Sequence, residues 1–100
     1  MSRATVVRYT TRPESADENE RLIRAVFAQL AEQRPAGLRY SSIRLEDGVS
    51  FLHVAVTVND DNPLVKLAAF QEFVSDIAAR CVDGPSSGSG TIVGSYEASL

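Results

Sequence analysis

The hydrophobic positions along the chain follow two different periods, and the change of period marks the predicted elements. Residues 5–10 read Thr-Val-Val-Arg-Tyr-Thr, and this run of β-branched and aromatic residues predicts a strand. Apolar residues then recur at helical spacing and predict a helix over residues 16–34. These apolar residues are Leu22, Ile23, Val26, Phe27 and Leu30. Ser15 and Glu18 have the spacing of a capping box, and Pro35 follows the last predicted turn.

Two further β-prone runs, residues 38–46 and 49–58, flank an Asp-Gly pair at 47–48. Such a pair predicts a hairpin, because a type I′ turn needs positive φ at both central positions. A second amphipathic helix is predicted over residues 62–83, with an Asn-Pro pair at its start and a Gly-Pro pair after its end. Its apolar stripe consists of Leu67, Phe70, Val74, Ile77 and Cys81.

The remaining residues complete a β-α-β-β-α-β order in one domain, residues 1–100. The Gly- and Ser-rich stretch 84–90 is predicted as a flexible connector, and residues 91–97 as the last strand. This order is the ferredoxin-like split β-α-β arrangement of the α+β class. We expect a four-stranded antiparallel sheet with two helices on one face, which leaves the other face uncovered.

The hairpin register sorts its side chains into two sets, because neighbouring residues on a strand point to opposite faces. The aliphatic set is predicted to meet the helices and comprises Ile43, Leu45, Leu52, Val54 and Val56, together with Ser41. The other set is predicted on the uncovered face and comprises Leu38, Tyr40, Ser42, Arg44, Phe51, His53, Ala55 and Thr57. A face of this apolar content predicts a homodimer whose sheets pack together.

Composition and charge exclude several classes of function. A hydrophobic content of 44% with 23% charged residues is that of a globular chain. The formal net charge of −3 argues against binding of nucleic acid, which needs a basic surface. One cysteine and one histidine argue against a metal site or a disulfide. Arginines interrupt the first ten residues and no apolar run is long enough for a membrane helix, so we expect a soluble cytoplasmic protein without membrane contact.

Four segments of the sequence are informative together: the Val-Val-Arg-Tyr opening, the Arg-Pro-Glu-Ser-Ala-Asp-Glu-Asn-Glu stretch, and the Asn-Pro-Leu and Phe-Gln-Glu-Phe segments of the second helix. With the predicted strand order, they resemble the antibiotic biosynthesis monooxygenase (ABM) domains of the dimeric α+β barrel superfamily. The resemblance covers nearly the whole chain and implies a tight dimer, a dimeric α+β barrel. Characterised members of the family include cofactor-independent oxygenases of phenolic or anthrone-like compounds. The resemblance therefore implies a reaction without a bound cofactor. The absence of tryptophan argues against the haem-degrading members.

Within this resemblance, His53 is the candidate general base, because an imidazole titrates near neutral pH. Tyr40 and Arg44 are its predicted catalytic neighbours, which would orient the substrate and stabilise an anion. Ser42, Phe51 and Arg8 are predicted to bind substrate; Arg8 would point to the same cavity as His53 if Val7 and Tyr9 face the helices. The structural alternatives are a hydrogen bond of His53 across a dimer interface and a surface ion pair of Arg8.

Two hypotheses for function remain open from the sequence. The first is a cofactor-independent monooxygenase, or a related small-molecule enzyme, that acts on an aromatic or polyketide-like compound. The second is a non-catalytic homodimer that binds a ligand or has a structural role. An open cavity on which His53, Tyr40 and Arg44 converge would favour the enzyme, and a filled interface around His53 would favour the second hypothesis.

Overall fold

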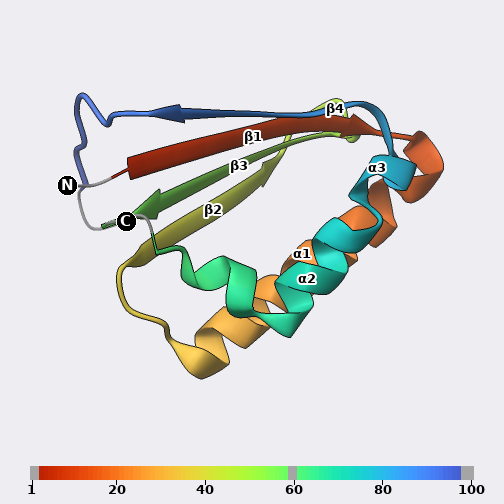
Figure 1. Ribbon diagram of the computed structural model, residues 1–100. Coiled ribbons are helices and arrows are strands. Elements are labelled where there is room, and N and C mark those ends of the chain that lie inside the picture. The colour runs from red at the N-terminus through yellow and green to blue at the C-terminus, as the bar shows by residue number, and fades with distance from the viewer. Residues whose placement is uncertain (1–2, 59–60, 98–100) are drawn as a thin grey trace.

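The structure is a computed structural model that describes residues 3–58 and 61–97. Four strands form one antiparallel sheet, and the helical segments pack on one of its faces (Figure 1). The strands are β1 (Arg3–Thr11), β2 (Leu38–Arg44), β3 (Ser50–Thr57) and β4 (Cys81–Gly90). The helices are α1 (Ala16–Gln33), α2 (Ala68–Ser75) and α3 (Ile77–Arg80), with short 3-10 turns η1 (Pro13–Ser15) and η2 (Pro63–Lys66).

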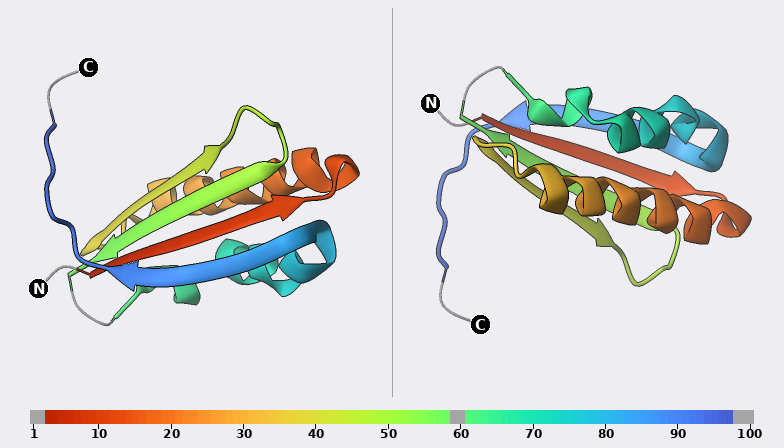
Figure 2. Two further views of the ribbon diagram at one scale, coloured as in Figure 1. Left: turned by 90° about the horizontal axis from the view of Figure 1, so that it is seen from above. Right: turned by 90° about the horizontal axis from the view of Figure 1, so that it is seen from below.

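The sheet has the strand order β2-β3-β1-β4, with every neighbouring pair antiparallel. Figure 2 shows the uncovered face of the sheet in one view and the helices covering the opposite face in the other. This arrangement confirms the predicted α+β fold, with its split β-α-β units and its helices on one face. No described helix is long and apolar enough to cross a membrane.

The β2–β3 hairpin has the predicted register but a different turn. Arg44 pairs with Phe51 and Ser42 pairs with His53, as counting outward from the Asp-Gly pair predicts. Gly48 has positive φ but Asp47 does not, so a two-residue type I′ turn is wrong. Instead, the Asp47 carboxylate accepts hydrogen bonds from the backbone N–H groups of Val49 and Ser50, which stabilises a wider loop.

The predicted assignment of the two sheet faces is wrong, and the faces are exchanged. Phe51, His53 and Ala55 are buried, and Phe51 and Ala55 belong to the core formed with the helices. The open face carries Ala4, Val6 and Arg8 of β1, Arg39, Ser41 and Ile43 of β2, and Leu52, Val54 and Val56 of β3. The prediction failed because both sets are apolar: the wide gap between sheet and helices is filled by aromatic rings, while the smaller aliphatic side chains line the open face.

The second half of the chain differs from the prediction in three places. The second helix is divided, because Leu67 has extended φ and ψ angles and separates η2 from α2. Asn62 does accept a hydrogen bond from the Leu64 backbone N–H, as an N-cap before Pro63 should. The last strand is residues 81–90 rather than 91–97, so the Gly- and Ser-rich stretch pairs with β1 instead of serving as a flexible connector.

Cys81 is the first residue of β4, not part of a helical stripe, and it lies opposite Thr11 of β1. Burial raises the pKa of its thiol, which disfavours the reactive thiolate. Cys81 thus remains a partly buried packing residue, as its apolar neighbours in the sequence suggested.

Helix α1 begins as predicted at Ala16, but its N-terminus is not closed by the predicted capping box. The Ser15 side chain makes no capping hydrogen bond. Glu18 instead binds the Arg21 guanidinium at 2.6 and 2.7 Å, and Glu20 binds Arg24 one turn further along the helix. At this end of α1, Glu18 therefore forms an ion pair with an arginine of the same helix and does not cap the helix.

Candidate functional site

His53 lies at the centre of a hydrogen-bonded chain that crosses the interior from the helices to the edge strand. Its Nε2 atom is 2.7 Å from the Tyr9 hydroxyl. Its Nδ1 atom is 2.7 Å from the Ser42 hydroxyl and 2.8 Å from the Tyr40 hydroxyl. The pairing of β3 with both β1 and β2 places these four residues on the helix-facing side of the sheet. Both ring nitrogens of the imidazole therefore have partners.

The chain continues from Tyr9 into the helices. The side-chain amide of Asn19, on α1, donates to the Tyr9 hydroxyl at 2.9 Å. The Arg80 guanidinium, at the end of α3, donates from Nε to Oδ1 of Asn19 at 3.0 Å. A second donor of Arg80 binds the Phe73 carbonyl at 2.6 Å, and its guanidinium lies over the Phe73 ring. Asn19 and Arg80 are both buried.

Burial controls the protonation of the imidazole. His53 is 4% exposed, and loss of hydration lowers its pKa from 6.5 to about 4. The ring is surrounded by aromatic side chains, with Tyr9, Tyr40 and Phe73 within 6 Å between ring centroids. Burial also raises the pKa values of the Tyr9 and Tyr40 phenols, although hydrogen bonds from Asn19 and Ser42 oppose part of that shift. At neutral pH the site holds a neutral imidazole between neutral phenols.

A cavity of about 200 Å³ lies beside His53, between the sheet and α2. The polar residues that line it are Tyr9, Tyr40 and His53, together with Thr5 and Asn62, and most of its wall is apolar. The apolar side chains of α2 and α3 that line it are Phe70, Phe73, Val74 and Ile77. An apolar chamber with a few converging polar groups is the usual form of a site for a small organic ligand.

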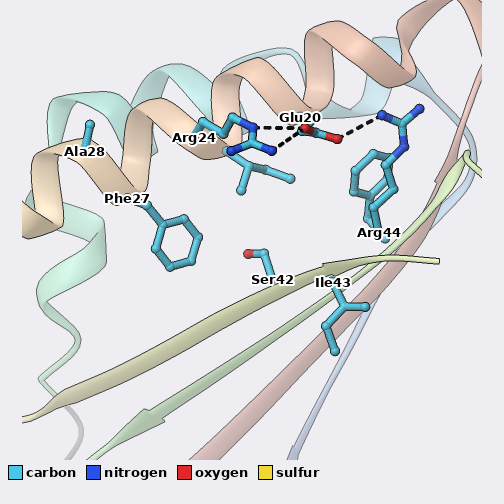
Figure 3. A pocket seen from close by; sticks show the side chains of 9 residues that line it. Glu20, Arg24, Phe27, Ala28, Ser42, Ile43 and Arg44 are labelled. Atoms are coloured by element: carbon cyan, nitrogen blue, oxygen red, sulfur yellow. Dashed lines mark hydrogen bonds and ion pairs between the residues drawn. The ribbon is translucent and has the colours of Figure 1, made fainter. Parts of the chain in front are cut away.

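A second, wider cleft of about 570 Å³ lies between α1 and β2 (Figure 3). Arg44 donates from Nη1 to Glu20 at 2.9 Å and to Asp17 at 3.1 Å, and Arg24 binds Glu20 from the other side. Figure 3 shows Ser42 on the side of β2 that faces α1 and Ile43 on the opposite side. Ser42 lines this cleft and also contacts His53, so it connects the cleft to the buried chain.

The predicted site residues are therefore divided between these spaces. Tyr40 and His53 line the apolar cavity, whereas Ser42, Arg44 and Phe51 line the cleft. Arg44 makes ion pairs with α1 and lies 5.6 Å from the centre of the Phe51 ring, so it does not converge with Tyr40 on His53. The placement of Arg8 beside His53 is wrong: Val7 and Tyr9 do face the helices, and this alternation puts Arg8 on the open face, opposite Leu52.

Sequence reasoning missed three members of the chain around His53: Tyr9, Asn19 and Arg80. Tyr9 could have been found, because pairing of the first strand with the third puts Val7 opposite His53 and Tyr9 two positions further along the same face. Asn19 stands among acidic residues at the start of a helix and gives no such signal. Arg80 ends a short helix that the pattern did not separate from its neighbour.

Comparisons with solved structures identify the fold. SnoaB, a cofactor-independent oxygenase from Streptomyces nogalater, is 20% identical to the chain, with 94% of this chain and 95% of SnoaB covered and a TM-score of 0.69. A protein from Mycobacterium tuberculosis is 12% identical, with 97% of this chain and 100% of that chain covered and a TM-score of 0.76. A proposed antibiotic biosynthesis monooxygenase from Nitrosomonas europaea is 10% identical, with 92% and 90% covered and a TM-score of 0.76.

No protein-family model matches the sequence, and no curated protein matches it significantly. The structural likeness nevertheless extends over nearly the whole of each chain, so the fold is that of the ABM-like proteins. At these levels of sequence identity the likeness concerns the fold. The chemistry has to be argued from the site itself.

Proposed function

We propose that this chain, which has the fold of the ABM-like proteins, is a cofactor-independent monooxygenase that acts on a phenolic compound in the cavity beside His53. The observation that carries the proposal is the neutral imidazole, flanked by Tyr9 and Tyr40, in the wall of a mostly apolar cavity. A neutral imidazole can accept a proton, and a phenol that binds with its rings against α2 would present its hydroxyl group to Tyr9, Tyr40 and His53. SnoaB, which shares the fold, is itself a cofactor-independent oxygenase.

The low pKa of His53 is compatible with this role because its cause is burial. Loss of hydration disfavours the imidazolium when no anion is nearby. Transfer of the phenolic proton creates both charges together, and their attraction in a buried site offsets much of that cost. The hydroxyls of Tyr9 and Tyr40 provide hydrogen bonds to the developing phenolate.

The chemistry requires no external reductant. Loss of the phenolic proton makes an electron-rich anion that reacts directly with dioxygen at the carbon para to the oxygen. One oxygen atom becomes a quinone carbonyl on that carbon, and the other leaves as water. The substrate supplies all four electrons, so phenol and dioxygen give quinone and water.

The cavity volume limits the size of the substrate. A cavity of roughly 150 Å³ is known to hold benzene, so about 200 Å³ suits one or two fused rings. A substrate of this size is smaller than the polyketide-like compounds that were also considered from the sequence. A substrate of two rings, such as a naphthol, therefore fits best.

The proposal includes a homodimer formed through the open face of the sheet, with the cytoplasm as the place of action. Val6 is 39% exposed and Ile43 is 48% exposed in the single chain, and both lie on this face with Leu52, Val54 and Val56. An apolar surface of this kind is typical of an interface. Each chain of such a dimer would keep its own cavity beside His53, because that cavity lies on the face of the sheet opposite the interface.

Oxygen uptake in the presence of 1-naphthol tests the activity, with the appearance of the quinone followed by absorbance. The wild-type protein should consume one dioxygen for each quinone formed. His53→Gln should lower the rate by about 10²–10⁴-fold, the usual contribution of a positioned base. Tyr96→Phe, which changes a 92% exposed side chain, is the matched control and should retain the wild-type rate.

The alternative is a non-catalytic protein that binds a small ligand. It is favoured by one observation, the engagement of both imidazole nitrogens by side chains of the protein itself. This alternative predicts that 1-naphthol binds in the cavity without oxygen uptake and that His53→Gln changes only the affinity.

A further inference from the structure

The buried Arg80 guanidinium fixes the orientation of the Asn19 side chain. Arg80 can only donate hydrogen bonds, so the Asn19 atom at 3.0 Å from its Nε must be the amide oxygen. The amide nitrogen of Asn19 then faces the Tyr9 hydroxyl, 2.9 Å away. Within the part of the chain that the structure describes, no carboxylate pairs with Arg80, so its charge acts on Asn19 and on the Phe73 carbonyl.

The orientation of Asn19 in turn decides where the Tyr9 proton lies. An amide nitrogen has no lone pair to offer, so the Tyr9 oxygen accepts from Asn19. Among the described residues, the other hydrogen-bond partner of this hydroxyl is His53 Nε2, at 2.7 Å. A buried hydroxyl proton without an acceptor is costly, and Tyr9 therefore donates to Nε2. A neutral imidazole that accepts at Nε2 carries its own proton on Nδ1.

The Nδ1 proton has acceptors at the other end of the chain. The Ser42 and Tyr40 hydroxyl oxygens lie 2.7 and 2.8 Å from Nδ1. Ser42 also lines the wide cleft between α1 and β2, whereas Tyr9 lines the apolar cavity. Nε2 thus reaches the apolar cavity through Tyr9, whereas Nδ1 reaches the cleft through Ser42 and the apolar cavity through Tyr40.

We propose that Arg80 and Asn19 are positioning residues that hold His53 in the tautomer protonated on Nδ1, so that Nε2 can accept a proton from the side of Tyr9 and Nδ1 can release one to Ser42 and the cleft. The inference rests on the proposed function for its use in catalysis. The ligand hydroxyl gives its proton to the Tyr9 oxygen while Tyr9 gives its own proton to Nε2. The imidazolium then releases the Nδ1 proton to Ser42 and on to solvent in the cleft, and the ligand remains as an anion.

The tautomer can be measured without any substrate, because the chain has one histidine. Imidazole ¹⁵N resonances of the labelled protein at pH 7 should show a single tautomer with the proton on Nδ1. Asn19→Asp is the decisive variant, because its carboxylate can only accept. Tyr9 would then donate to the new carboxylate and accept from His53 Nε2–H. The proton of the neutral imidazole should therefore lie on Nε2 in this variant instead of on Nδ1. The ion pair of the new carboxylate with Arg80 should keep this variant folded.

Two further variants complete the test. Gln29→Glu makes the same amide-to-acid change elsewhere on α1, where Gln29 accepts from the Ala69 backbone N–H, and should leave the tautomer unchanged. Tyr9→Phe removes the hydroxyl that donates to Nε2 and should give a mixture of tautomers even if Asn19→Asp does not fold. A wild-type proton on Nε2 would overturn the inference. A folded Asn19→Asp variant that keeps the wild-type tautomer would also overturn it. If Asn19→Asp does not fold, the wild-type tautomer in Tyr9→Phe would do the same.

The same variants separate this inference from the proposed function. If the tautomer changes as expected but no phenol is oxidised by the wild-type protein, the proposed function fails and the positioning role stands. If both hold, Asn19→Asp should lower kcat while the KM for 1-naphthol stays near the wild-type value, since neither Asn19 nor Arg80 lines the cavity.

Discussion

The Tyr9 hydroxyl lies 2.7 Å from His53 Nε2, although 44 positions separate the two residues in the sequence. Pairing of β1 with β3 brings them to the same face of the sheet, and their rings stack with centroids 5.4 Å apart. The site therefore exists only when the sheet is formed. Folding and the state of the imidazole are linked, and this linkage gives the first prediction.

Stability should fall as the pH is lowered from about 6.5 to about 4. Burial holds the pKa of His53 at about 4 in the folded chain, against 6.5 when the ring is exposed. Between these values the unfolded chain binds a proton that the folded chain excludes, so acid favours unfolding. The difference between these two pKa values corresponds to about 3 kcal/mol of unfolding free energy, which is fully present above pH 6.5. Urea unfolding at a series of pH values measures it.

His53→Gln provides the control for this pH dependence. The variant has no group that titrates near pH 6, so its stability should change little between pH 7 and pH 5. Glu18, Glu20 and Asp47 have lowered pKa values, and their protonation destabilises both proteins only at lower pH. Equal slopes for wild type and variant between pH 5 and 6.5 would show that His53 is not the group responsible.

The second prediction concerns the open face of the sheet. Val6→Asp should convert the proposed dimer into folded monomers, because it would place a charge in the proposed apolar interface but leave the core of each chain intact. Phe51→Asp should instead unfold the chain, at a cost of about 4 kcal/mol or more, since Phe51 is 1% exposed among core residues. Sedimentation measures assembly, and circular dichroism measures folding.

The outcomes of these two substitutions are distinct. A dimer that persists in Val6→Asp would place the interface elsewhere on the molecule. A folded, monomeric Phe51→Asp would restore the face assignment that the sequence first suggested.

The third prediction concerns the bend at the start of β4. Gly84 has a φ of +84°, and a Cβ atom there would lie 2.9 Å from the Arg8 carbonyl oxygen. Gly84→Ala should therefore cost roughly 2 kcal/mol or more of unfolding free energy. Gly88→Ala, in the same strand with open space around its Cα, should change stability by less than about 0.5 kcal/mol. Similar melting temperatures for the two variants would contradict this account of Gly84.

Parts of the fold could be read from the sequence because strong local signals specify them. The Asp-Gly pair gave the register of β2 and β3, and the Ser15–Glu18 spacing gave the start of α1 at Ala16, although Ser15 makes no capping hydrogen bond. Residues 84–90 were predicted as a connector instead of a strand, because their small side chains do not favour a strand by themselves. The strand forms through its pairing with β1, which the local sequence does not show. Extended dihedral angles at Leu67 break the second helix, and no proline or glycine marks that position.

The candidate site was predictable in its centre but not in its surroundings. His53 was singled out as the one histidine beside Tyr40 and Ser42, and these three residues are hydrogen-bonded. Periodicity could not decide which face was covered, since one face is lined by aromatic and the other by aliphatic side chains. Arg44 was expected beside His53, but two carboxylates of α1 hold it in the cleft.

The position of a bound phenol shows whether the cavity beside His53 is the substrate site. A structure of the protein with 1-naphthol, or intermolecular NMR contacts in solution, would locate the ligand. We expect the rings against Phe70, Phe73 and Val74, with the hydroxyl group within hydrogen-bond distance of Tyr9, Tyr40 or His53. A naphthol seated in the cleft between Arg24 and Arg44, with the His53 resonances unchanged, would contradict it.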